Sequence, residues 1–198
     1  MATNPLSIVG FGNKRAEADF YPTPPETTEE LLKREDFQGS IWECASGDGS
    51  MTKVLKQHFK NVFSSDIRED ESIEGIKGLD FLNSDKKFDN IITNPPYKYA
   101  KEFVLKAKKS ANKKIALLLK LVFLEGIGRY EMFQDKDFPL KKIYVFCRRQ
   151  KIYADGKIGK NSGLIAYAWF VWEKNYSGAP TISWINGLKQ KVYKGGTT

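Results

Sequence analysis

Four consecutive residues, Asn94-Pro95-Pro96-Tyr97, place two prolines and a tyrosine directly after a strand-forming run. Residues 88–93 are rich in Ile and bounded by polar residues, which predicts a short buried strand. Proline cannot donate to a sheet, so the strand must end there, and Pro95 holds Asn94 extended. We expect a rigid corner carrying an amide, a locked carbonyl and a ring, at the place where open α/β sheets bind ligands. A strand terminator without a ligand is the alternative.

A glycine turn forms the second group of candidate residues. The segment ECASGDGS carries Gly47 and Gly49 between a predicted strand and a predicted helix, where the backbone must turn tightly. Dinucleotide sites use G-x-G-x-x-G at this place to receive a ligand at a helix N-terminus. Thr52 replaces the third glycine, so the pattern is equally typical of an ordinary turn. Glu43, four residues before Gly47, adds a carboxylate.

Two further acidic residues follow along the chain. Asp66 ends the second predicted strand, at a spacing that suits a carboxylate accepting hydrogen bonds from both hydroxyls of a ribose. Asp80 and Phe81 stand between that strand and the proline corner, where they suit an adenine amino group and its ring. Asp80 could instead be a turn residue or a helix cap.

Strands and helices alternate along the chain, which predicts a doubly wound α/β fold with a mostly parallel sheet. The last predicted strand, 164–174, follows its predecessor after a Gly-rich loop with no helix between, so we expect it to be antiparallel. The predicted strands are 40–45, 61–67, 88–93, 114–123, 141–148 and 164–174, and the predicted helices are 50–59 and 99–111.

Composition limits the class of protein and its partners. The chain has 198 residues, of which 41% are hydrophobic, enough for the core of one domain. No run approaches the roughly 20 apolar residues of a membrane span, and the N-terminus lacks a secretory pattern, so we expect a cytoplasmic protein. The net charge of +8 and the pI near 9.3 favour a polyanionic partner.

Cysteine and histidine usage gives no sign of a metal site. We expect Cys44 and Cys147, which form no CxxC pair, to be buried reduced thiols. The only histidine, His58, falls on a predicted helix and is expected at the surface.

The order of these motifs resembles that of a class I S-adenosylmethionine-dependent methyltransferase. Along the chain they are a strand, E-x-x-x-G-x-G, a helix, a second strand ending in Asp, then Asp-Phe, and then a strand followed by NPPY. More narrowly, these blocks resemble the small phage-type enzymes that methylate the amino group of adenine in DNA. The resemblance runs from about Asp19 to Trp172 and includes YAWFVW near the end. It implies a seven-stranded Rossmann-like sheet, a single catalytic domain over 1–198 and S-adenosylmethionine as the cofactor.

The resemblance also assigns residues to the cofactor. The N-terminal block DFYPTPPETTEELL resembles the one that contacts the methionine end, which implies roles for Tyr21, Thr23 and Pro24. Alternatively, the block could be a proline-rich segment that leads into a capped helix. One departure is Cys44, which replaces a proline in the glycine turn and should change local packing more than chemistry.

The resemblance implies that the corner binds an adenine amino group. The Asn94 side-chain oxygen and the Pro95 carbonyl, locked by Pro96, would accept the two N–H bonds and so localise the nitrogen lone pair. Tyr97 would stack on the base after the base has left the duplex. No general base is needed, because the proton can leave to solvent after transfer.

Two basic stretches could contact a polyanion. The first begins at Lys98 and continues through 101–114, although part of it must be the solvated face of a helix. The second is RRQKIYADGKIGKNSG, in which basic residues alternate with glycines and one ring, as in a loop that grips phosphate. A solvated hairpin is the alternative. The candidates for substrate contact here are Arg148, Arg149, Lys151 and Tyr153, the last as support for the extruded base.

Several alternatives stay open. An RNA base amino group or a protein glutamine presents the same planar NH₂ group as adenine. A nucleic-acid-binding subunit without turnover is a third interpretation. Fewer than thirty residues follow Trp172, too few for a separate target-recognition domain, so any sequence selectivity must come from short loops or a partner chain. The oligomeric state is not predicted.

Overall fold

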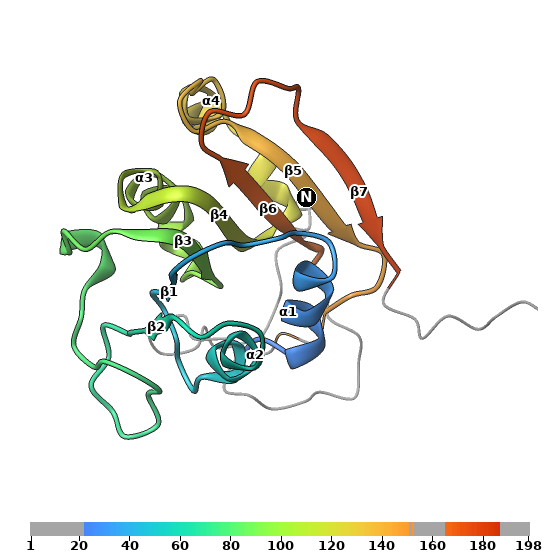
Figure 1. Cartoon of the computed structure of the whole chain (residues 1–198). Helices are drawn as coiled ribbons and strands as arrows, with labels where there is room; N and C mark the ends of the chain where they lie inside the picture. Colours follow the sequence, from blue (N-terminus) through green and yellow to red (C-terminus); the bar gives the residue numbers. More distant parts are fainter. Residues whose placement is uncertain (1–21, 151, 153–164, 187–198) are drawn as a thin grey trace, which may run out of the picture.

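The computed structural model describes residues 22–150, 152 and 165–186 (Figure 1). They form one seven-stranded sheet in the order β2-β1-β3-β4-β6-β5-β7. The strands are Ile41–Glu43 (β1), Val62–Ser64 (β2), Phe88–Thr93 (β3), Ala111–Lys120 (β4), Leu140–Phe146 (β5), Tyr167–Glu173 (β6) and Thr181–Ile185 (β7).

The predicted fold class is confirmed. Strands β2, β1, β3 and β4 pair in parallel, and β6 lies antiparallel between β4 and β5. This is the reversed strand expected from the Gly-rich loop before it. The seven strands that the resemblance implies are present, but the predicted strand ranges did not include the position of β7, which pairs in parallel with β5 at the edge of the sheet.

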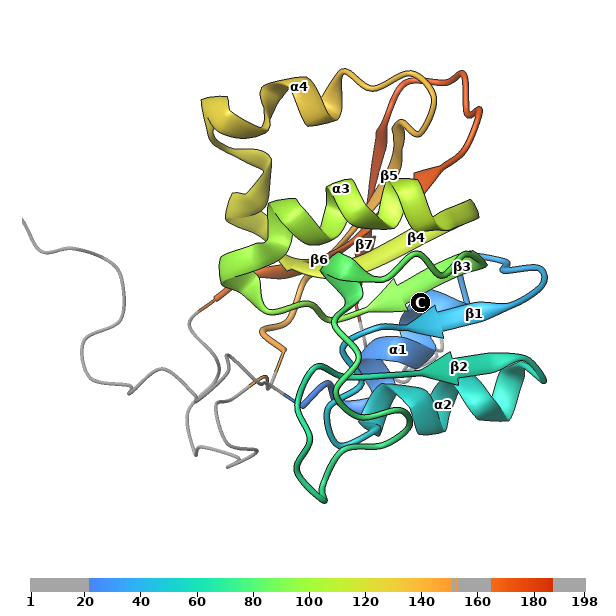
Figure 2. The ribbon, with the colours of Figure 1, turned by 90° about the vertical axis from the view of Figure 1, so that its left-hand side faces the viewer.

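Helices cover both faces of the sheet (Figures 1 and 2). Helices α1 and α2 lie on one face, and α3 and α4 lie on the other. Single-turn 3₁₀ segments follow several strands, notably after β3 and β4. The helices are Pro25–Leu32 (α1), Ser50–His58 (α2), Ala100–Ser110 (α3) and Tyr130–Phe133 (α4).

The core has two layers because successive strand residues point to opposite faces. In β4, Ile115 and Leu117 pack with α3, whereas Ala116 and Leu118 pack on the side of α1 and α2. All four of these side chains are fully buried. A central strand apolar on both faces is what a sheet covered by helices on both sides requires.

Trp169 of β6 ties α1 to the sheet. Its indole Nε1 donates to the Thr27 carbonyl at 2.9 Å, and the side chain is fully buried. Thr27 also donates through its hydroxyl to the Gln150 side chain at 2.7 Å. Because Thr23 lies just before α1, these contacts also position the start of the candidate site.

Two local expectations were wrong. Strand β4 ends at Lys120, and residues 121–124 form a 3₁₀ turn in which the Leu121 amide donates to Ala166. Cys44 is buried as expected, but Cys147 is exposed because β5 ends one residue before it. His58 is exposed on α2 as predicted and hydrogen-bonds Glu29.

No helix in the described ranges is long and apolar enough to cross a membrane. The same residues contain no cluster of three or more His, Cys, Asp or Glu side chains arranged to hold a metal ion.

We predict that Trp169→Phe lowers the free energy of unfolding by at least about 2 kcal/mol, because it leaves a void and removes the bond to the α1 carbonyl. Urea unfolding monitored by far-UV circular dichroism measures this loss. Trp184→Phe is the matched control: Trp184 is 67% exposed on β7, so its effect should stay within about 0.5 kcal/mol. Equal effects of both changes would contradict the anchoring role of Trp169.

Candidate functional site

One cavity of about 400 Å³ opens at the carboxyl ends of β1, β2 and β3. In Figure 2 these parallel strands point toward the left of the view, and the cavity lies at that edge. Its size is within the range of small-molecule sites in proteins. The sequence-predicted residues that line it are Thr23, Glu43, Asp66, Asp80, Phe81, Asn94, Pro95, Pro96 and Lys98.

The glycine turn has a conformation that only glycine adopts readily. Gly47 and Gly49 have φ of 54° and 74°, and Gly49 is the N-cap of α2. A Cβ on Gly49 would lie 2.4 Å from the Glu74 Cβ, so the turn also needs glycine for close packing. The residues flanking these glycines, Ser46 and Asp48, line the cavity.

Asp66 holds this turn in place. Its Oδ2 accepts from the Gly47 amide at 2.9 Å, and its Oδ1 accepts from the backbone amide and Nε of Arg68 at 2.9 and 3.2 Å. The residue is only 6% exposed. Asp66 therefore does structural work that the sequence did not reveal, while its oxygens retain acceptor capacity because each carboxylate oxygen has more than one acceptor site.

Glu43 lies fully buried at the end of β1, with its carboxylate accepting from the Thr52 hydroxyl. Burial raises the pKa of Glu43 well above its usual value, and the nearby Asp48 and Asp66 carboxylates act in the same direction. Thr52 stands where the dinucleotide pattern has its third glycine. Its hydroxyl explains this departure, because it donates to the buried carboxyl group of Glu43.

Asp80 is a helix cap, the alternative that its sequence context had left open. It precedes the 3₁₀ turn 81–83 and accepts from the Leu82 amide at 2.9 Å. Its neighbour Phe81 is 2% exposed and packs edge-on against Trp42, with ring centroids 5.0 Å apart. Both residues still contribute to the cavity wall, Phe81 as part of its apolar floor.

The proline corner is connected to the N-terminal block. The Asn94 Nδ2 donates to the Thr23 hydroxyl at 3.0 Å, across 71 positions of sequence. Thr23 is 5% exposed, so this bond is largely shielded from water. The Pro96 carbonyl accepts from the Tyr99 amide at 2.9 Å and fixes the exit from the corner.

Tyr97 does not line the cavity. Its ring packs against Tyr167 with centroids 5.5 Å apart, and the Lys120 ammonium lies 4.7 Å from its centroid. Lys98 follows it into the cavity wall, with its ammonium 4.5 Å from the Tyr99 ring. The corner therefore has two sides, with the two prolines toward the cavity and the tyrosine away from it.

The remaining predicted residues are only partly covered by the structure. Pro24 is the N-cap of α1 and is not among the cavity residues, whereas Pro22 is. Arg148 and Arg149 are exposed after β5, which runs parallel to β4 and ends at the same edge of the sheet. Tyr21, Lys151 and Tyr153 lie outside the described residues.

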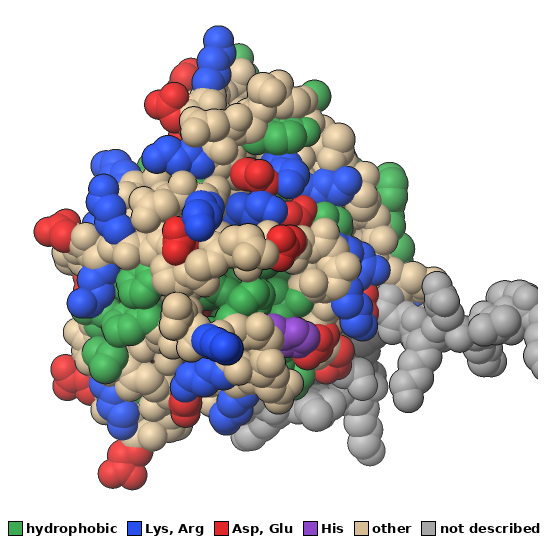
Figure 3. Space-filling model, viewed as in Figure 1, with side chains coloured by type: hydrophobic (Ala, Val, Ile, Leu, Met, Phe, Trp, Pro, Cys, Tyr) green, Lys and Arg blue, Asp and Glu red, His purple; other side chains and the backbone are tan. Residues whose placement is uncertain are grey.

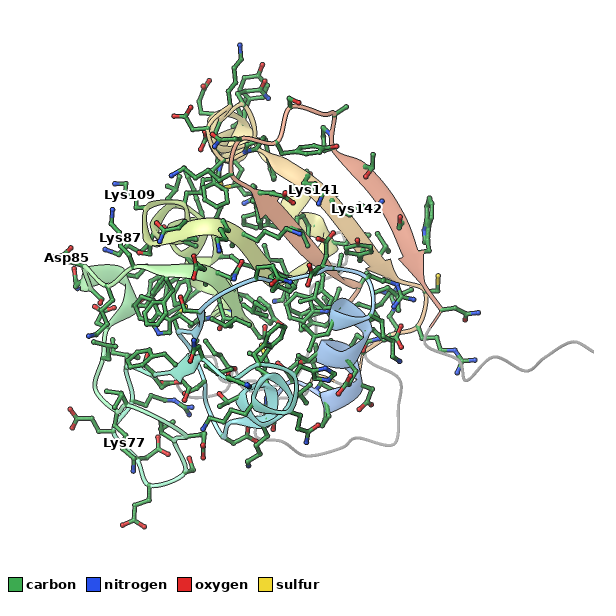
Figure 4. The ribbon with its side chains drawn as sticks, in the orientation of Figure 1. Lys77, Asp85, Lys87, Lys109, Lys141 and Lys142 are labelled. Carbon is green, nitrogen blue, oxygen red and sulfur yellow. The ribbon has the colours of Figure 1, made fainter. Side chains whose placement is uncertain are left out.

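The lysine-rich stretch after the corner does not form one basic surface. Helix α3 carries it back to the amino ends of the strands, where Lys108 pairs with Asp135 at 2.8 Å and Lys114 with Glu35 at 3.0 Å. Lys87 and Lys109 project outward on the side of Asp85 (Figure 4). The face of the molecule seen in Figure 3 carries Lys and Arg side chains interspersed with Asp and Glu.

The sequence reasoning missed an apolar part of the cavity. Ile67 directly follows Asp66, is 58% exposed and lines the cavity. Leu82 and Phe103 line the cavity as well. The position of Ile67 in the sequence could have predicted this role, because it comes immediately after Asp66. A flat ligand held by Asp66 would contact the side chain of the next residue.

No protein-family model and no curated protein matches the chain. Solved structures do. A "putative RNA methyltransferase" from Pyrococcus horikoshii aligns with a TM-score of 0.61 and 16% identity, over 83% of this chain and 91% of that one. The chain has a methyltransferase fold.

Two further neighbours have the same fold at lower identity. A "putative class I S-adenosylmethionine-dependent methyltransferase" from Listeria monocytogenes aligns with a TM-score of 0.57 and 12% identity, over 82% of this chain and 65% of that one. The magnesium protoporphyrin IX methyltransferase from Synechocystis, solved with bound S-adenosylmethionine, aligns with a TM-score of 0.53 and 12% identity, over 76% and 79%. The names of these neighbours refer to RNA in one case and to magnesium protoporphyrin IX in another, so the shared fold leaves the substrate open.

The raised pKa of Glu43 predicts a pH dependence of stability. Between the usual carboxyl pKa near 4.5 and the raised one, the folded state holds a proton that the unfolded state releases, so the free energy of unfolding falls as pH rises. Glu43→Gln should remove this decline, which urea titrations between pH 5 and 8 would measure. Glu74→Gln is the control, because Lys56 lowers the pKa of Glu74 and the decline should persist. An unchanged decline in Glu43→Gln would contradict a protonated Glu43.

Proposed function

We propose that the protein transfers a methyl group from S-adenosylmethionine to the exocyclic amino group of adenine in DNA. The observation that carries the proposal is the shared cavity: Asn94 and Pro95 line the same space as Glu43 and Asp66. This transfer requires that acceptors for the substrate amino group and residues that bind a nucleoside lie in one cavity. If Asn94-Pro95-Pro96-Tyr97 only ended a strand, it would not need to lie beside Glu43 and Asp66.

The cavity residues fit the proposed cofactor in three respects. The buried Glu43 carboxyl group would face the amino acid end of the cofactor, whose positive charge would favour ionisation of this carboxyl. Asp66 has acceptor capacity for ribose hydroxyls. Ile67, Leu82 and Phe103 offer apolar contact for a purine. When bound, the cofactor would supply a methyl group activated on a sulfonium.

The corner would activate a poor nucleophile. An adenine amino nitrogen shares its lone pair with the ring, so transfer requires that pair to be localised. Because the Asn94 Nδ2 donates to Thr23, the side-chain oxygen is the atom of this amide that can accept a substrate N–H. The Pro95 carbonyl would accept the second N–H. Two acceptors also stabilise the positive charge that develops on the nitrogen.

The choice of DNA rests on charge and on resemblance. The chain carries a net charge of +8, and the exposed Arg148 and Arg149 lie at the edge of the sheet where the cavity opens. Both favour a nucleic acid over a protein glutamine. The YAWFVW sequence, which forms most of β6, resembles the last strand of the small adenine enzymes.

The test is to incubate the protein with tritiated S-adenosylmethionine and, separately, DNA, RNA and protein. Nuclease digestion and chromatography of the labelled polymer identify the modified base. Label in N6-methyladenine from DNA supports the proposal. Label confined to RNA or protein overturns the DNA assignment, and label in none overturns the activity.

We predict that Asn94→Ala lowers the rate of methyl transfer by about 10²-fold or more, because one of the two acceptors is lost. The dissociation constant for S-adenosylmethionine, measured by calorimetry, should stay within about threefold, because the corner acts on the substrate. Near-normal turnover of Asn94→Ala would contradict the role assigned to the amide.

Asp66→Ala is the matched comparison, with the opposite expectation. This change removes the acceptor for the Gly47 amide and for ribose hydroxyls, so cofactor affinity should fall first. Turnover at saturating cofactor should fall much less than in Asn94→Ala. If both variants lost affinity and rate in the same ratio, the two halves of the cavity would not have separate roles.

A further inference from the structure

A hydrogen bond between two proline-rich segments lies in the wall of the cavity. The Asn94 Nδ2 donates to the Thr23 hydroxyl at 3.0 Å, although 71 positions separate the two residues in sequence. Both residues line the cavity. The resemblance implies that Thr23 helps to hold the cofactor, but this role does not explain why its hydroxyl bonds to the amide of the corner.

The backbone keeps the Thr23 hydroxyl in place. Prolines flank Thr23 on both sides, and Pro24 restricts it to extended conformations. Pro24 is the N-cap of α1, and its carbonyl accepts from the Thr27 amide at 2.9 Å. The Thr27 carbonyl in turn accepts from the indole of Trp169, which fixes α1 to the sheet. Thr23 is therefore held by the helix and not by the corner.

The other partner of the bond is held independently. Asn94 directly follows β3, and Pro95 restricts its backbone in the same way as Pro24 restricts that of Thr23. The side-chain torsions of Asn94 are therefore the main freedom that remains to its amide. The bond to Thr23 limits this freedom, because Thr23 is 5% exposed and water competes little for its hydroxyl.

The bond also fixes which end of the amide can meet the substrate. The oxygen and the NH₂ group of an asparagine side chain have nearly the same shape, and a half-turn of the side chain exchanges them. With the Nδ2 bonded to Thr23, the oxygen is the end that can accept a substrate N–H. The reversed amide would present its own N–H bonds to the substrate amino group, donor against donor.

The Thr23 hydroxyl can donate as well as accept, so the direction of the bond needs a cause. Among the residues that the structure describes, none accepts the Thr23 hydroxyl proton. Because Thr23 lines the cavity, an acceptor on a bound ligand can take this proton, and the carboxylate at the amino acid end of the proposed cofactor is such an acceptor. A hydroxyl that donates to the ligand can only accept from Asn94, so the Nδ2 would stay toward Thr23.

We infer that Thr23 is a positioning residue, whose hydroxyl holds the Asn94 amide in the place and orientation in which the amide oxygen accepts a substrate N–H. The inference rests on the proposed function. It connects the N-terminal block to the methyl-transfer step, whereas the resemblance connects that block to cofactor binding alone. A misplaced acceptor stabilises the transition state less and changes ground-state binding little, so its loss lowers kcat.

The experiment compares Thr23→Val, which keeps the shape of the side chain and removes its hydroxyl, with Thr23→Ser, which keeps a hydroxyl. At saturating S-adenosylmethionine and DNA, Thr23→Val should lower kcat about tenfold, and Thr23→Ser should stay within about twofold of the wild type. Thr28→Val is the matched control in α1. Thr28 is fully buried and its hydroxyl has no hydrogen-bond partner among the described residues, so this change should leave kcat within about twofold.

A second background separates positioning from general damage. Asn94→Asp places two equivalent oxygens at the corner, so a half-turn of this side chain exchanges one acceptor for another. In Asn94→Asp, the further change Thr23→Val should lower kcat by no more than about threefold. A purely structural defect would give the same loss in both backgrounds.

A third readout needs no turnover. The exchange of the Asn94 side-chain amide protons with water can be followed by ¹⁵N-edited NMR, with the signals assigned by their absence in Asn94→Asp. Thr23→Val should speed this exchange at least about tenfold in the cofactor-free protein, because the acceptor of these protons is lost. Thr28→Val should not change it.

The outcomes separate this inference from the proposed function. An unchanged kcat in Thr23→Val, with only the KM for S-adenosylmethionine raised, overturns the positioning role in favour of a simple cofactor contact. Equal losses in the Asn94 and Asn94→Asp backgrounds, equal losses in Thr23→Val and Thr23→Ser, or wild-type amide exchange as fast as in Thr23→Val overturn it alone. Transfer by the wild type to RNA in place of DNA overturns the DNA assignment, and the same variants then test Thr23 on RNA. No transfer to any acceptor overturns both proposals.

Discussion

Parallel pairing of β1 with both β2 and β3 is the constraint on which the site depends. It brings the ends of three strands to one edge, so that Glu43, Asp66 and Asn94 share a cavity although they are spread over 51 positions of sequence. Each strand ends for its own local reason: a glycine turn, an acidic residue in a tight loop, or a proline that cannot donate. The fold places these three ends together, and the chemistry of each end then becomes part of one site.

The site is held together by hydrogen bonds within the protein. Asp66 connects the glycine turn to the loop that carries Arg68, and Thr23 connects the start of α1 to the corner. Groups fixed in this way do not have to be ordered when a ligand arrives, which lowers the entropic cost of binding and of reaction. The same bonds have a second consequence: a change at Asp66 or Asn94 also removes a contact that holds the site together.

The elements with strong local signals were predicted and the others were not. Helix α2 and strand β3 follow from apolar periodicity and from the prolines that end β3. Strand β7 has five residues, and its existence depends on pairing with β5 across a distant part of the chain. Asp80 could be assigned as a cap only from its bond to Leu82. The pairing of Lys108 with Asp135, which removes that lysine from any basic surface, is likewise invisible in sequence.

Tyr97 lies on the side of the proline corner that faces away from the cavity. Its ring contacts Tyr167 and Lys120, outside the cavity that Asn94 and Pro95 line. Under the proposed function, a base stacked on Tyr97 would approach the corner from the side away from the cavity. A transfer in which nitrogen, methyl and sulfur lie in line requires this opposed arrangement, since the nitrogen must approach the methyl from the side away from the sulfur.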